Sequence, residues 1–92
     1  MSKYLISYDL IGQKDYVGIS KAIMRIADGC VCPLKSVWVI THKGNATDII
    51  NALKPYIDSD DRLLVVELTG DADWTSTLDE DNKKWLSDYL LN

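Results

Sequence analysis

The order of the hydrophobic patterns along this chain constrains its fold more than any other feature. Four short segments are rich in β-branched and aromatic residues, as β-strands are: 3–9, 30–34, 36–41 and 62–69. Between the first and second segments, and again between the third and fourth, apolar residues instead recur at spacings of three and four. That spacing is typical of an amphipathic helix. The sequence therefore predicts the order strand, helix, strand, strand, helix, strand.

Local signals suggest where the two helices begin and end. Asp15 is a suitable N-cap for the first helix, and Gly29 is expected just after its end. Thr47 is expected to cap the second helix, and Pro55 to kink or end it. The expected apolar stripes are Tyr16, Ile19, Ile23, Ile26 and Ala27 in the first helix, and Ile49, Ile50, Leu53, Tyr56 and Ile57 in the second.

With right-handed crossovers, this order closes as a four-stranded antiparallel sheet with both helices on one face. The predicted fold class is thus α+β, of the ferredoxin-like βαββαβ type. Pro33 cannot donate a ladder hydrogen bond, so the segment 30–34 is expected at an edge of the sheet. Cys30 and Cys32 are interpreted as reduced packing residues, because zinc needs four ligands and the chain has one histidine.

A chain of 92 residues makes a single domain, here a core over 1–70 and an acidic tail over 71–92. The spacing in Thr77–Glu80 resembles a capping box, which predicts a short helix over 79–91. Its apolar residues Trp85, Leu86 and Tyr89 are expected to pack on the domain or on a partner subunit. The strands carry apolar residues on both faces, so we also expect a homodimer that buries the helix-free face.

The charge is unevenly distributed. Residues 1–70 hold eight basic and eight acidic side chains, whereas residues 71–92 hold two basic and six acidic ones, which accounts for the net charge of −4. A protein that coats nucleic acid normally has a basic excess, so any nucleic-acid binding must rest on a local patch. No apolar run approaches the roughly 18 residues needed to cross a bilayer, and Asp9 interrupts the N-terminal apolar run early, so a cytoplasmic location is expected.

Asp9 is the first candidate for chemistry, because it ends the first strand beside a loop. A carboxylate there offers hard oxygen ligands to Mg²⁺, although one carboxylate is too few for a tight site. If the first strands of two protomers met, two Asp9 side chains could share one ion. The simpler interpretation is that Asp9 caps the loop that follows.

The other candidate site residues also have simpler structural interpretations. Ser36 precedes the third strand, where its hydroxyl could act in catalysis or bond to nearby backbone. Trp38 and Trp74 could stack on bases, although a tryptophan in an apolar strand is more often a core residue. His42 could serve as a general acid or base, or be idle at the surface. The lysines and arginine that could contact phosphate are Lys14, Lys21, Arg25, Lys35 and Lys43.

Two segments together resemble a known family. YLISYDL (residues 4–10), followed by a lysine-bearing loop and an amphipathic helix, resembles the opening of the small CRISPR-associated adaptation nucleases. KSVW (residues 35–38) resembles their polar-Ser-Val-aromatic motif. The similarity runs over about residues 3–70, and the virulence-associated protein D toxins share the fold and a similar first strand.

The resemblance implies a ferredoxin-like homodimer with Mg²⁺-dependent endonuclease activity on RNA or DNA. It places Asp9 of each protomer at the dimer seam as the metal ligand, with one ion shared across the dimer, and Ser36 near the same seam. The alternative is a non-catalytic dimeric module that binds nucleic acid as a structural subunit, or a protein partner through its acidic tail and open sheet edge.

Overall fold

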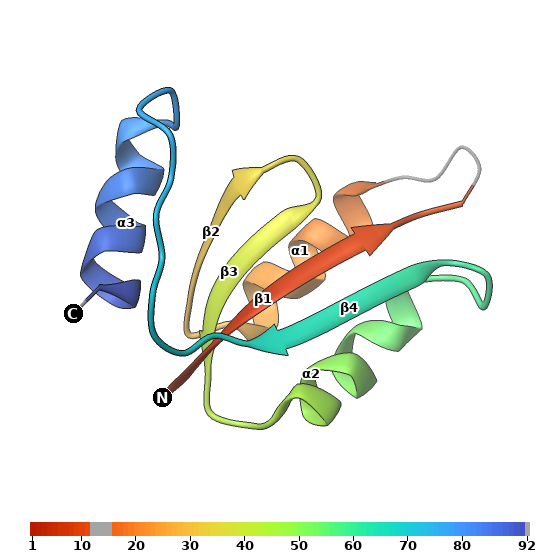
Figure 1. Ribbon diagram of the computed structural model, residues 1–92. Helices are drawn as coiled ribbons and strands as arrows, with labels where there is room; N and C mark the ends of the chain where they lie inside the picture. Colours follow the sequence, from red (N-terminus) through yellow and green to blue (C-terminus); the bar gives the residue numbers. More distant parts are fainter. Residues whose placement is uncertain (12–15, 92) are drawn as a thin grey trace.

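The computed structural model describes residues 1–11 and 16–91, and it confirms the predicted α+β, ferredoxin-like arrangement. The four strands form one antiparallel sheet in the order β2-β3-β1-β4 (Figure 1). The strands are β1 (Ser2–Asp9), β2 (Gly29–Leu34), β3 (Val37–His42) and β4 (Arg62–Glu67). The helices are α1 (Tyr16–Ile26), α2 (Ala46–Leu53), the 3-10 turn η1 (Lys54–Tyr56) and α3 (Glu80–Leu90).

The main core lies between the sheet and the helices α1 and α2. Alternate residues of β1 point into it, namely Tyr4, Ile6 and Tyr8, as the period of two requires. The helices contribute a buried stripe of residues three and four apart, and each large apolar side chain buried in this way stabilises the fold by about 1.5–3 kcal/mol. The fully buried members of the stripe are Ile19, Ile23, Ile49 and Leu53.

Strand β3 is buried on both faces, as its continuous apolar run predicts. Trp38 and Ile40 face the helices, and Trp38 is a core residue that donates its indole N–H to the Tyr8 hydroxyl over 3.2 Å. Val39 and Thr41 face the other way and are buried as well. The second face of the sheet is therefore covered where β3 crosses it.

The tail provides this cover. From the end of β4 the chain crosses to the side of the sheet opposite α1 and α2, and α3 then lies beside β2 (Figure 1). Leu86 is buried, at 5% exposed, as expected. Trp85 packs beside Gly29 of β2, where a Cβ would lie 3.5 Å from its ring, at ordinary van der Waals distance. Tyr89 stacks on Trp85 with ring centroids 4.4 Å apart but stays 44% exposed, so only part of the expected packing occurs.

The rest of the helix-free face stays open. On β4, Leu64 is 57% exposed and Val66 is 43% exposed. They pair in register with Ser7 and Leu5 of β1, so these four residues share one face of the sheet. We call the four residues the open strip.

Three expectations about helix ends were wrong. Asn45, not Thr47, caps α2: its side chain accepts from the Asp48 N–H and Asp48 accepts from the Asn45 N–H, which makes a complete capping box. Asp79, not Thr77, caps α3, since its carboxylate accepts from two backbone N–H groups of the first turn. Gly29 does not follow α1 directly but begins β2, where a Cβ would lie 3.2 Å from the Thr41 hydroxyl oxygen of β3.

Other boundaries lie close to their expected places. Helix α2 ends at Leu53 and Pro55 sits in η1, so the proline ends the α-helix as predicted. Ser36 belongs to the β2–β3 turn and β3 begins one residue later. Strand β4 ends at Glu67, two residues earlier than expected. The predicted cap Asp15 lies outside the described residues. Among the helices that are described, none has the length and apolar character needed to cross a bilayer.

The tail should contribute to stability through Leu86. Replacing Leu86 by Ala should lower the free energy of unfolding by about 2–5 kcal/mol, because it leaves a cavity under α3. Leu91→Ala is the matched control, since Leu91 is 52% exposed and should change stability by less than about 0.5 kcal/mol. Removing everything after Gly70 should cost several kcal/mol. Urea unfolding measures all three variants, and equal midpoints would show that the tail is only an appendage.

Candidate functional site

Asp9 is the last residue of β1, and its side chain is exposed. Tyr4, Ile6 and Tyr8 point to the helices, so the alternation along β1 places Asp9 on the helix-free face with Leu5 and Ser7. The carboxylate is therefore at one end of the sheet, on the face that the open strip occupies. That position leaves it accessible to an ion or to a second protein chain.

Arg62 lies directly beside Asp9. It is the first residue of β4 and is the register partner of Asp9 in the antiparallel β1–β4 pair, and its side chain is also exposed. Directly paired residues of an antiparallel ladder have Cβ atoms about 5 Å apart on the same face. A carboxylate and a guanidinium are thus neighbours at this end of the sheet. Arg62 is not among the candidate site residues that the sequence indicated.

Ser36 flanks Asp9 on the other side. Its carbonyl oxygen accepts a hydrogen bond from the Tyr8 N–H over 3.3 Å, so the β2–β3 turn lies against the end of β1. Ser36 has a φ of 61°, which is the left-handed backbone conformation. Residues other than glycine adopt this conformation at a cost of about 1–2 kcal/mol. The fold thus gathers both predicted site residues, and Arg62, at one end of three adjacent strands.

The surface around Asp9 is only slightly hollowed. A shallow depression of about 220 Å³ is lined by Ser7, Tyr8, Asp9, Arg62, Leu63 and Leu64. It offers one carboxylate to a cation and one guanidinium to an anion. Within one chain this is too little for a tight Mg²⁺ site, which needs several oxygen ligands, but a second copy facing the depression would double both groups.

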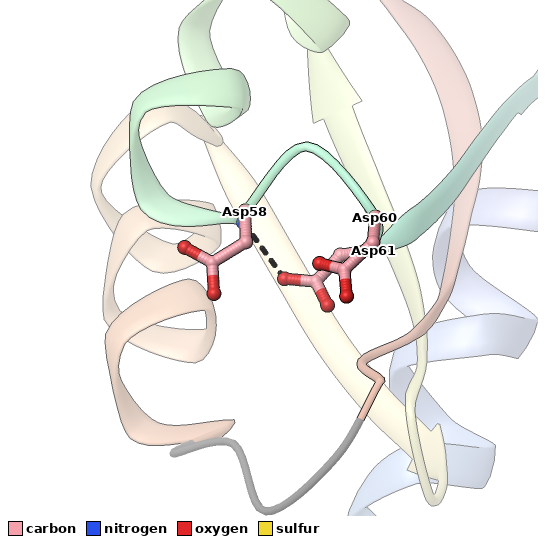
Figure 2. Close-up of side chains that lie close together, drawn as sticks. All are labelled: Asp58, Asp60 and Asp61. Carbon is pink, nitrogen blue, oxygen red and sulfur yellow. Dashed lines mark hydrogen bonds between the residues drawn. The ribbon is translucent and has the colours of Figure 1, made fainter.

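A second group of carboxylates lies in the turn before β4. Ligand oxygens of Asp58, Asp60 and Asp61 lie within 4.8 Å of one another, and Figure 2 shows the three side chains gathered on the short turn after η1. Asp61 is engaged by the backbone: its two oxygens accept from the N–H groups of Ile11 and Asp58, each over 2.8 Å. These bonds tie the start of β4 to the segment after β1. The turn therefore has a structural role that accounts for Asp61.

Trp38, Arg25 and His42 have contacts elsewhere in the fold. Trp38 is in the core, so it offers no face to a base. Arg25 donates to the Tyr56 hydroxyl over 2.8 Å and lies over its ring, which binds α1 to η1. His42 accepts the Gly44 N–H on Nδ1 over 2.9 Å and so has a local structural role. Lys14 falls outside the described residues.

The two cysteines are free, and they do not form a chemical centre with the groups near Asp9. Cys30 is half-buried and packs against the core, whereas Cys32 is exposed on the edge strand β2. Burial raises the pKa of both thiols, which keeps them in the less reactive protonated form at neutral pH. The expectation of reduced packing residues fits Cys30 better than Cys32.

Trp74 lines an apolar groove of about 480 Å³ between the tail and the sheet. Leu5, Val37 and Val39 form its floor, and Leu86 and Leu90 its wall. Its lining is mostly apolar, with Asp73 as its one charged residue. The groove therefore lies apart from the polar chemistry at Asp9.

Substitutions at Ser36 can separate the effect of its backbone conformation on stability from the effect of its hydroxyl group. Ser36→Gly should raise stability by about 1 kcal/mol, because glycine adopts this conformation without steric cost. Ser36→Val should lower stability, since a β-branched residue tolerates positive φ poorly. Thermal unfolding measures both variants. A Ser36→Gly protein less stable than the parent would mean that the hydroxyl has a stabilising bond.

Comparisons with known proteins identify no relative. No family model, no curated protein and no solved structure matches this sequence at a significant level. The residues at the end of β1, and the resemblance of the motifs around them, are therefore the indications of function.

Proposed function

We propose that this protein is a dimeric, Mg²⁺-dependent endonuclease that acts on RNA or DNA, as the small CRISPR-associated adaptation nucleases and the virulence-associated protein D toxins do. The observation that carries the proposal is the position of Asp9, an exposed carboxylate at the end of β1 on the only partly covered face of the sheet. Ser36, in the β2–β3 turn, and Arg62, at the start of β4, flank it on its two sides.

The open strip supports a dimer that places two aspartates together. Leu64 and Val66 lie on the same face as Asp9. Leu64 is two residues from Arg62, which is the register partner of Asp9. Burying this apolar strip against the same strip of a second copy would bring the ends of the two β1 strands toward a shared axis. In such an isologous interface each protomer contributes its own Asp9 to one cation.

Each flanking residue has a role in this proposal. The Arg62 guanidinium binds a phosphate oxygen and offsets the charge that develops during cleavage. Before substrate binds, the same group limits the repulsion between the two carboxylates. Ser36 positions the end of β1 through its carbonyl bond to Tyr8. A bound Mg²⁺ would supply an activated water and stabilise the charge on the phosphate.

The alternative function is a non-catalytic module. It is favoured by the net charge of −4, because an acidic surface repels nucleic acid at low ionic strength. In that case the dimer binds a protein partner through the acidic tail or the open sheet edge. Assays for self-association and for cleavage separate the two functions.

The dimer prediction concerns the open strip. Sedimentation at micromolar concentration should give about twice the chain mass of 10.4 kDa. Leu64→Glu should shift the equilibrium to the monomer, because it places a charge in the centre of an apolar interface. Met24→Glu, on an exposed site of α1, is the control and should remain dimeric. A monomeric parent protein would contradict both the dimer and the shared ion.

The activity prediction concerns Asp9. Asp9→Asn should reduce cleavage to background, because the ion loses its only carboxylate ligands from the protein, while the dimer persists. The parent activity should need a divalent ion and rise with pH as the bound water ionises. Asp71→Asn, an exposed carboxylate of the tail, should cleave as the parent does. Single-stranded RNA and short duplex DNA at low salt are the substrates to test.

Arg62→Ala should weaken substrate binding by about 10- to 100-fold, the usual contribution of a hydrogen bond to a charged group.

Asp9→Asn protein that cleaves as well as the parent would assign the activity to other residues. If neither protein cleaves, the non-catalytic module becomes the preferred function.

A further inference from the structure

The helix-free face of the sheet has a raised half and a low half. The tail rises on the side that holds β2, where α3 contacts that strand (Figure 1). On the other side, Leu64 and Val66 of β4 are exposed, so the tail does not cover them. The apolar groove of about 480 Å³ runs between the tail and the sheet, and Leu5 is part of its floor. Leu5 also belongs to the open strip, so the apolar surface continues from the low half into the groove.

The open strip is too small to hold two copies together by itself. It comprises four residues, whereas a stable interface buries about 800 Å² and about 20–30 residues on each partner. The dimer proposed above therefore needs adjoining surface. The groove is apolar and adjoins the strip, so the two together fit a second copy of this chain.

The position of Asp9 determines how the second copy lies. In a dimer of two stacked sheets with aligned strands, the two-fold axis runs between the sheets, either along the strands or across them. An axis across the middle of the strands sets Asp9 of one protomer over the start of its partner's β1. The two Asp9 residues are then about 20 Å apart, because a strand rises about 3.3 Å per residue. An axis along β1 instead brings the two Asp9 side chains face to face.

The strand order then decides which surfaces meet. In the order β2-β3-β1-β4, strands β3 and β4 lie on opposite sides of β1. Rotation about an axis along β1 exchanges these sides, so β4 of one protomer stacks over β3 of its partner. Val37 and Val39 of β3 form part of the groove floor. The low half of each protomer thus meets the groove of the other, whereas an axis across the strands would set the two tails against each other.

Charges of both signs lie at each end of this contact. At the Asp9 end, each protomer contributes one carboxylate, Asp9, and two cations, Arg62 of β4 and Lys35 of the β2–β3 turn. At the other end of β1, Lys3 and Asp71 of one protomer line the same hollow. Like charges therefore meet at neither end without opposite charges beside them, and the surfaces between the two ends are mostly apolar.

We propose that the groove of each protomer receives Leu64 and Val66 of the other, so that the tail of one copy completes the cover of its partner's sheet. The inference rests on the proposed function, because the ion shared by the two Asp9 side chains sets the direction of the axis. It adds a defined contact to the proposed dimer: the β1 residues of the two open strips meet across the axis, and the β4 residues enter the grooves. The tail then takes part in assembly as well as in the stability of its own chain.

The test replaces Leu64 of the full chain by photoleucine, a photoreactive analogue of similar size. This protein is mixed with parent protein labelled with nitrogen-15, Mg²⁺ is added, and the mixture is irradiated. Crosslinked peptides of mixed isotope content come from two different protomers. They should join position 64 of one protomer to Val37 or Trp74 in the groove of the other. Crosslinks from position 64 to β4 of the partner, or a dimer without crosslinks to the groove, would overturn the proposal.

Two matched variants of the tail test the contact in solution. Ala72→Glu places a carboxylate in the groove lining, whereas Ser76→Glu places one on an exposed residue of the tail that does not line the groove. Ala72→Glu should raise the dimer dissociation constant about tenfold or more, because it buries a charge in an apolar contact, and Ser76→Glu should change it little. Sedimentation equilibrium measures both. Equal dissociation constants for the two folded variants would contradict the groove contact.

The outcomes separate this inference from the proposed function. A dimer that depends on Asp9 for cleavage, but crosslinks β4 to β4, keeps the nuclease and overturns the groove contact. A dimer that crosslinks to the groove and cleaves nothing supports the contact and counts against the nuclease. A monomeric parent protein overturns both.

Discussion

The pairing of β1 with both β3 and β4 is the constraint on which the rest of the structure depends. Tyr4, Ile6 and Tyr8 must all face the helices, because they form the centre of the core. Two of them are also held by hydrogen bonds: the Tyr4 hydroxyl donates to the Gly44 carbonyl over 2.8 Å, and the Tyr8 hydroxyl accepts from Trp38. A shift of one residue in register would turn these aromatic side chains to the other face. The outward position of Asp9 follows directly from this alternation.

The unequal cover of the two faces gives the molecule its accessible surfaces. Helices α1 and α2 close one face, whereas the tail covers only part of the other and leaves Leu64 and Val66 of β4 exposed. The Trp85 ring of the tail lies beside Gly29 of β2. Strands β1 and β4 therefore keep an open strip and an open edge. These two surfaces, rather than a deep cavity, are where an additional chain or substrate has access.

The acidic turn shows how similar side chains can differ in role. Asp9 and Asp61 both lie at the same end of the sheet, one at the end of β1 and one just before β4. Asp61 uses both oxygens to bind backbone N–H groups, and so fixes the turn. Asp9 points to the helix-free side and is exposed. Composition and spacing do not distinguish the two, since the difference lies in which backbone groups the fold brings within reach.

The sequence by itself determined the order of elements, because each period, two for strands and 3.6 for helices, reflects which faces must be buried. It also determined that a proline ends α2 and that the tail forms a helix. It did not settle the caps, since Asn45 and Thr47 are both acceptable and only one meets the N–H groups of the first turn. Arg62 could have been found, because antiparallel pairing of the first and last strands puts the end of one beside the start of the other. Only the tertiary structure decided the register that joins Arg62 to Asp9, the edge that stays open and the part of the sheet that the tail covers, because these depend on contacts between residues far apart in the chain.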